Sequence, residues 1–158
     1  MDGIIYVGID PGKEGAIAAI FPDGRIEIRD LPFDKDGHFQ CLAFKNMVSE
    51  WGSNLAIMFE DPFNKYGRAK VMFMNAGKIL GVVESIGHKV NLVTPSKWKT
   101  RMELKGSKQA SLDMAKILYP DIEEGGQLLR GLRAKRECHD RAEALLLAHF
   151  LKENLLWA

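Results

Sequence analysis

The feature that most constrains the fold is an apolar run near the amino terminus that ends in a carboxylate. Residues 4–9 (IIYVGI) are rich in β-branched side chains, and Asp10 follows them directly before a Pro-Gly pair. Such a run predicts a buried strand. A carboxylate at its end must be hydrogen-bonded, paired or bound to a metal, because desolvating it is otherwise too costly. The alternative is that Asp10 only begins the turn, where aspartate is common.

The composition is that of one ordinary globular domain. The 158 residues, of which 46% are hydrophobic and 27% charged, are enough for one sizeable core and unlike a disordered or fibrous chain. No apolar run approaches the roughly 20 residues that cross a bilayer, and no secretory leader is evident. The two cysteines, Cys41 and Cys138, form neither a disulfide framework nor a zinc-binding pair. We therefore expect a single domain over residues 1–158 in the cytoplasm, without a membrane partner.

Charge is divided unevenly along the chain. Residues 1–59 carry 5 Lys and Arg against 9 Asp and Glu, whereas residues 60–158 carry 17 against 12. The basic residues of the second half cluster at 64–70, 96–108 and 130–136, with aromatic residues among the first two clusters. Such clusters favour a polyanionic partner such as DNA, although any one of them alone can be an ordinary solvated surface.

Hydropathy patterns and turn signals predict an α/β fold with a mixed sheet. Residues 3–10, 14–21 and 25–31 are typical of three antiparallel strands, since the turns PGKEG and PDG separate them. The apolar runs at 55–60 and 90–93 predict two further strands.

Helices are predicted before, between and after the last two strands. Apolar side chains recur at helical spacing in four segments, which are 38–51, 68–86, 107–119 and 138–156. Ser96 or Ser107 can cap short helices after Pro95. The last helix carries Ala142, Leu145, Leu146 and Phe150 along one face. Residues 123–136 are rich in glycine and charge, and we expect a mobile loop there.

Three further acids occupy positions like that of Asp10. Glu60 ends the apolar run at 55–59, and Asp140 and Glu143 begin the last helix at a spacing that puts both on one face. If the first and fourth strands are parallel neighbours, Asp10 and Glu60 share one edge of the sheet. Four clustered carboxylates raise one another's pKa unless a cation intervenes, and an all-oxygen cluster suits Mg²⁺ or Mn²⁺ rather than zinc. Two such ions can stabilise the attacking and leaving oxygens of a phosphodiester displacement.

Each of these acids also has a purely local interpretation. Glu60 can simply precede the turn at Asp61-Pro62, and Asp140 can be an acid that the helix dipole favours. The predicted carboxylate cluster would be absent only if all of these local interpretations held at once.

Four motifs carry a resemblance to a known family. They are GIDPG at 8–12, FEDPF at 59–63, TPSKWK at 94–99 and HDRAEALLLA at 139–148. Their order along nearly the whole chain resembles that of the RuvC-like Holliday junction resolvases of the ribonuclease H-like superfamily. The resemblance implies a five-stranded mixed sheet (three antiparallel and two parallel strands) flanked by helices. It also implies a homodimer that cuts four-way DNA junctions by paired, metal-dependent nicks.

The resemblance assigns roles to individual residues. It implies that the catalytic and metal-binding acids, which would hold two Mg²⁺ or Mn²⁺ ions per active site, are Asp10, Glu60, Asp140 and Glu143. The last is more often Asp in the bacterial enzymes, so Glu143 is one methylene longer. Phe63 resembles the aromatic residue that stacks on bases at the junction centre. The implied DNA-binding residues are Lys105 and Lys108, with Lys97, Lys99 and Arg101 as weaker candidates.

Two neighbours of these residues have competing interpretations. His139 adjoins Asp140 and can assist the reaction, although capping or partly buried histidines are more common. Trp98 is better explained as a core residue than as a base-stacking one.

Other functions compete with junction resolution. A less selective nuclease of the same fold is one alternative, and a DNA-binding module without catalysis is another. GIDPG also resembles the first phosphate loop of sugar kinases and actin-like ATPases, but those proteins need two such domains. The chain lacks the G-x-x-x-x-G-K-[ST] pattern, and we expect no nucleotide cofactor.

Overall fold

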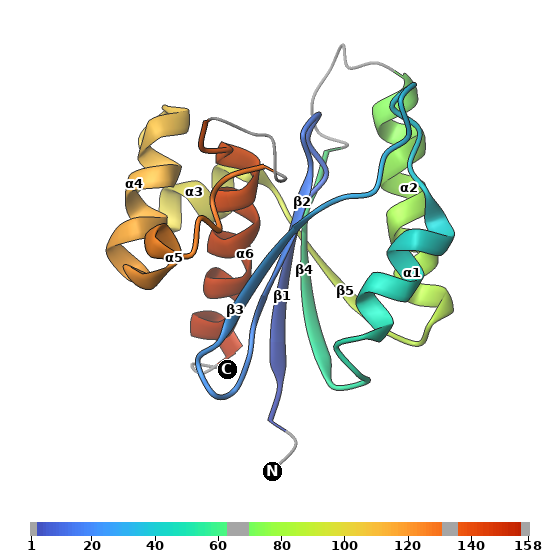
Figure 1. Cartoon of the computed structure of the whole chain (residues 1–158), viewed down its shortest axis with the longest axis horizontal. Helices are drawn as coiled ribbons and strands as arrows, with labels where there is room; N and C mark the ends of the chain where they lie inside the picture. Colours follow the sequence, from blue (N-terminus) through green and yellow to red (C-terminus); the bar gives the residue numbers. More distant parts are fainter. Residues whose placement is uncertain (1–2, 63–69, 131–135, 156–158) are drawn as a thin grey trace.

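A five-stranded sheet lies between two layers of helices in the computed structural model, which describes residues 3–62, 70–130 and 136–155 (Figure 1). The strand order is β3-β2-β1-β4-β5. The first three strands form an antiparallel meander, and β4 and β5 continue the sheet parallel to β1. The bounds of the strands are β1 (Ile5–Asp10), β2 (Ala16–Ile20), β3 (Ile26–Asp30), β4 (Leu55–Glu60) and β5 (Val90–Val93). The predicted mixed sheet is confirmed.

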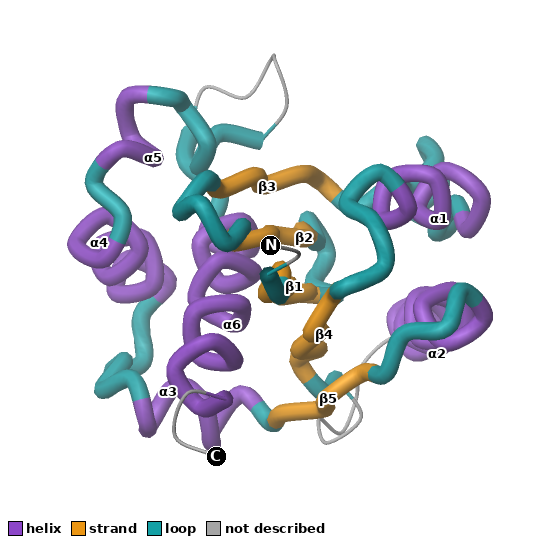
Figure 2. Tube along the Cα trace, turned by 90° about the horizontal axis from the view of Figure 1, so that it is seen from below, coloured by secondary structure: helices purple, strands orange, loops and turns teal. Residues whose placement is uncertain are grey.

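The helices divide between the two faces of the sheet (Figures 1 and 2). One face is covered by α1 (Cys41–Ser49) and α2 (Lys70–Ser85). The other is covered by α3 (Pro95–Arg101), α4 (Lys108–Leu118), α5 (Asp121–Glu124) and α6 (His139–Leu155). Each helical layer closes a separate apolar core against the sheet. No helix in these described ranges is both long and apolar enough to cross a membrane.

Of the two predicted serine caps, the structure shows one. Ser107 caps α4 as expected, because its hydroxyl oxygen accepts a 3.1 Å hydrogen bond from the backbone N–H of Ala110. Ser96 does not cap α3, which begins at Pro95 after Thr94. Proline suits the first helical position because the N–H it lacks would have no partner within the helix. The predicted loop at 123–136 begins with the last two residues of α5, contains the buried Leu128, and includes residues 131–135, which lie outside the described part of the chain.

The last helix is more deeply buried than its sequence pattern predicts. Side chains all round α6 are buried, including every residue from Ala142 to Ala148. The reason is that α6 lies between the sheet and the helices α3 and α4, so it has no solvated face over this length (Figure 2). The helix therefore approaches β1 closely and can carry its first-turn acids over the end of that strand.

Candidate active site

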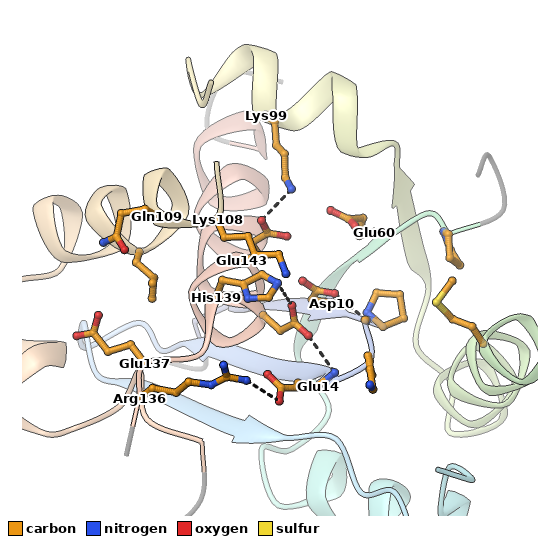
Figure 3. A pocket seen from close by; sticks show the side chains of 17 residues that line it. Asp10, Glu14, Glu60, Lys99, Lys108, Gln109, Arg136, Glu137, His139 and Glu143 are labelled. Atoms are coloured by element: carbon orange, nitrogen blue, oxygen red, sulfur yellow. Dashed lines mark hydrogen bonds and ion pairs between the residues drawn. The ribbon is translucent and has the colours of Figure 1, made fainter. Parts of the chain in front are cut away.

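The four predicted acids line one pocket at the carboxyl ends of β1 and β4 (Figure 3). Ile9 pairs with Phe59 in the parallel register, so Asp10 and Glu60 follow at the same edge. Asp140 and Glu143 reach the same pocket from the first turn of α6. All four side chains are buried, and the cavity they line has a volume of about 650 Å³. The structure thus brings together residues that lie up to about 130 positions apart, and their chemical roles stay a prediction.

Asp10 both begins a turn and faces the pocket. Its Oδ1 accepts a 2.8 Å hydrogen bond from the backbone N–H of Gly12, as a turn-forming aspartate does. The turn packs tightly against the acids, because a Cβ on Gly12 would lie 2.8 Å from Oδ2 of Asp140 and 3.0 Å from Oδ1 of Asp10. The two interpretations of Asp10 are therefore compatible, and the turn fixes the carboxylate in the site.

Asp140 is held from two sides. The backbone N–H of Glu14 donates a 3.1 Å hydrogen bond to its Oδ2, and Nε2 of His139 lies 2.7 Å from its Oδ1. The next residue, Arg141, is buried and anchors the start of α6 to β3 through Oδ1 of Asp30 at 2.7 Å and the carbonyl of Ile28 at 2.6 Å. The 2.7 Å contact described above therefore pairs the His139 imidazole with the carboxylate of Asp140.

The two glutamates are held by α3 and α4. The indole N–H of Trp98 donates to Oε2 of Glu60 at 2.8 Å. Glu143 accepts two bonds at Oε1, from Nζ of Lys99 at 2.8 Å and from the hydroxyl of Ser111 at 3.0 Å. Trp98 is fully buried, as its core assignment predicts, but its polar contact with the pocket was not predicted.

The electrostatics of the pocket reflect crowded negative charge. Burial raises the pKa of Asp10 well above its usual range, and the charges of Asp140, Glu60 and Glu143 raise it further, although the Gly12 hydrogen bond opposes them. Burial also raises the pKa of Asp140, against the charge of His139 and the Glu14 hydrogen bond.

Lys99 supplies positive charge to this cluster. Partial burial alone would lower its pKa, but the hydrogen bond and charge of Glu143, helped by Glu60 and Asp10, raise it above the ordinary value. The ammonium therefore stays charged and acts as a counterion inside the pocket.

The donor set fits a hard divalent cation in its chemistry. Four carboxylates converge on one cavity, and a cation there would offset both the burial and the mutual repulsion that raise the pKa of Asp10. Within the described ranges, no group of three His, Cys, Asp or Glu side chains is arranged around a single point that could hold an ion. Glu143 instead points Oε1 at Lys99 and Ser111, so in this arrangement protein donors occupy that oxygen.

The predicted DNA-binding residues fall in different places. Lys99 and Lys108 line the carboxylate pocket (Figure 3). Lys97, Lys105 and Arg101 are all exposed and described, and none of the three lines that pocket. Arg101 instead borders a separate cavity beside Met102 and His149. Phe63 lies outside the described residues.

The rim of the pocket contains an ion-pair cluster that the sequence analysis missed. Oε1 of Glu14 lies 3.2 Å from Nη1 of Arg130 and 3.6 Å from Nη2 of Arg136. The available signal was an acid in the turn PGKEG and a basic cluster at 130–136, which the sequence alone assigned only to a polyanionic partner. Cys138, next to this cluster, is a buried free thiol whose pKa is raised by burial.

Two solved structures of RuvC from Thermus thermophilus have the same fold. The complex of T. thermophilus RuvC with a Holliday junction substrate aligns with a TM-score of 0.60 at 16% identity, covering 99% of this chain and 98% of that chain. A second T. thermophilus RuvC structure aligns with a TM-score of 0.53 at 17% identity, covering 96% and 95%. No protein-family model and no curated protein matches the chain. The likeness establishes a RuvC-like, ribonuclease H-like fold along nearly the whole chain.

Proposed function

We propose that this protein is a metal-dependent endonuclease that resolves four-way DNA junctions as a homodimer. The observation that carries the proposal is the pocket of four buried carboxylates at the carboxyl ends of β1 and β4 and the first turn of α6. Buried, mutually repelling carboxylates are costly to a fold, and they are typical of sites that bind divalent ions. The fold shared with RuvC, one structure of which holds a Holliday junction substrate, supports DNA as the partner.

The residues of the pocket have distinct proposed roles. The acids Asp10, Glu60, Asp140 and Glu143 would hold two Mg²⁺ or Mn²⁺ ions, which when bound stabilise the attacking and leaving oxygens of a phosphodiester. Lys108 stands exposed at the pocket wall, where its ammonium can contact a DNA phosphate. His139 orients Asp140 through the 2.7 Å contact. Two copies of the chain would supply the two sites that paired nicks in a symmetric junction require.

The proposal is tested with the purified protein and three labelled substrates of matched sequence: a four-way junction, a duplex and a flap. We expect paired nicks in the junction, dependent on Mg²⁺ or Mn²⁺, and little cutting of the duplex. Sedimentation at micromolar concentration should give a dimer. A monomer in both the free and the junction-bound protein, or nicking that persists in EDTA, would contradict the proposal.

Binding should weaken steeply with salt, because Lys and Arg release counterions when they contact phosphates. Lys105→Ala and Lys108→Ala should each reduce the log–log salt slope by about 1, the loss expected when one phosphate contact disappears. Lys45→Ala is the matched control, since Lys45 is an exposed lysine on α1, in the opposite helical layer. Fluorescence anisotropy on a junction across a salt series measures the slopes. An unchanged slope would place that lysine away from the DNA.

Phe63→Ala separates a junction resolvase from a less selective nuclease. Stacking on an unpaired base is worth roughly 1–3 kcal/mol, so junction cleavage should fall about 5- to 150-fold while nicking of a flap changes less. A core role for Phe63 predicts a lower melting temperature and equal losses on every substrate. Rates on the three substrates, measured together with thermal melting, distinguish the two. Equal losses on every substrate at an unchanged melting temperature would exclude both the base-stacking role and the core role of Phe63.

A further inference from the structure

The indole of Trp98 reaches from the core into the carboxylate pocket. Trp98 lies on α3, is fully buried, and is among the largest completely enclosed side chains in the described residues. Its N–H donates to Oε2 of Glu60 over 2.8 Å, and Glu60 is itself buried at 8% exposure. Packing alone needs only the shape of the ring. The hydrogen bond is a separate contribution of the nitrogen.

This contact restricts Glu60 in a way that its own strand does not. Glu60 is the last residue of β4, and a glutamate side chain there has three rotatable bonds. An indole enclosed by core residues has almost no freedom of its own, so its N–H is a fixed donor. A carboxylate that accepts a hydrogen bond from a fixed donor is held in one orientation, and such partners tune how well a ligand binds its ion.

The neighbouring residue makes a contrasting contact. Lys99 donates to Glu143 and carries positive charge, so a divalent ion in the pocket would compete with it. Trp98 is neutral and is a donor only, so it holds Glu60 without opposing a cation. Adjacent residues of α3 thus contact the two glutamates with opposite consequences for ion binding.

We propose that Trp98 is a positioning residue that fixes the Glu60 carboxylate for divalent-ion binding. The inference rests on the proposed function, because it treats Glu60 as a ligand. It adds a residue of α3 that would act on the ion through Glu60. The ring of Trp98 packs in the core, whereas its N–H contacts Glu60 in the pocket.

The test compares Trp98→Phe with a matched control, Trp51→Phe. Trp51 is also buried, at 6% exposure, and its indole N–H also donates to a carboxylate, Oε2 of Glu27 at 3.0 Å. Neither Trp51 nor Glu27 lines the carboxylate pocket. Both substitutions therefore remove one indole-to-carboxylate hydrogen bond and the packing of a buried indole, but only Trp98 contacts a carboxylate that lines the pocket.

Two quantities are measured in titrations with Mg²⁺ and Mn²⁺: the rise in melting temperature and the rate of junction nicking. Trp98→Phe should raise the half-saturating ion concentration roughly 10- to 100-fold in both. Trp51→Phe should keep the wild-type ion dependence while lowering the melting temperature of the ion-free protein. Saturating Mn²⁺ should recover most of the nicking rate of Trp98→Phe.

Unchanged half-saturation in Trp98→Phe, or an equal shift in Trp51→Phe, would overturn the positioning role while leaving the proposed function standing. A wild-type protein that shows neither ion-dependent stabilisation nor nicking would instead overturn the proposed function, and this inference with it. The melting titration needs no DNA, so it reports on Glu60 even if the preferred substrate is another branched DNA.

Discussion

Asp10→Asn should abolish ion-dependent nicking while leaving junction binding intact or tighter. The substitution removes a proposed ligand and one negative charge from a pocket that must accept phosphate, whereas the lysines at its wall remain. A loss on the order of 10³-fold is expected if the ion that Asp10 would help to hold no longer stabilises the charge of the reacting phosphate. Cleavage rates on a labelled junction, and binding measured in EDTA, check the two halves of the prediction. Substantial nicking by a folded variant would show that Asp10 is not a ligand required for the reaction.

Asp23→Asn is the matched control for this experiment. Asp23 makes the same kind of turn contact, since its Oδ1 accepts a 3.0 Å hydrogen bond from the backbone N–H of Arg25. It lies in the β2–β3 turn and does not line the pocket. If Asp10 mattered only as a turn residue, the two variants would behave alike. We expect Asp23→Asn to nick at the wild-type rate.

Asp10→Asn should also alter the pH dependence of stability in the absence of divalent ions. Burial and the three other acids raise the pKa of folded Asp10 above its unfolded value. Such a group stabilises the fold fully below its unfolded pKa, and that contribution is lost as pH rises through the folded pKa. Asparagine cannot ionise, so the variant loses nothing over this range. Its melting temperature should exceed that of the wild type by a margin that grows as pH rises above about 4.

Added Mg²⁺ should reverse this order of stability. An ion that binds only the folded protein raises its melting temperature by mass action, and the wild type keeps all four proposed ligands. Melting curves at several pH values, with and without Mg²⁺, measure both effects. A margin that stays constant with pH would show that the pKa of Asp10 is the same in the folded and the unfolded protein.

The strands and the acid cluster were predictable because their signals are local. The run at 55–60 has the same bounds as β4, and Asp10 and Glu60 were each marked by ending an apolar run. Parallel pairing of β1 with β4 then brings the two acids to one edge. The spacing of Asp140 and Glu143 needed only the geometry of one helical turn.

The contacts that hold those acids were not predictable, because they join distant segments through packing. Trp98 and Glu60 are 38 positions apart, Ser111 and Glu143 are 32 apart, and Arg141 and Asp30 are 111 apart. Nothing in a local pattern distinguishes a core tryptophan from one whose N–H reaches a carboxylate. The nearly complete burial of α6 was missed for the same reason, since it depends on the helices stacked behind it.

Gly8→Ala should have the largest effect on the fold, although Gly8 stands inside an apolar strand without any local signal. α6 crosses β1 at this residue, and a Cβ added to Gly8 would lie 2.0 Å from the carbonyl oxygen of Ala144 and 2.5 Å from the backbone nitrogen of Ala148. Both are backbone atoms, so the whole helix must move away from the strand. We expect a loss of at least about 3 kcal/mol in the free energy of unfolding, above the ordinary cost of overpacking.

The helix that must move also carries Asp140 and Glu143, so stability and site assembly should fail together. The melting temperature should fall by roughly 10 °C, and any folded protein should respond less to Mg²⁺ than the wild type does. Gly81→Ala is the control: Gly81 lies in α2, where an added Cβ meets nothing within 4 Å, and alanine should stabilise that helix by about 1 kcal/mol. A Gly8→Ala protein with wild-type melting and ion response would mean that α6 does not approach β1 this closely. The acids of α6 would then lack the contact that brings them over Asp10.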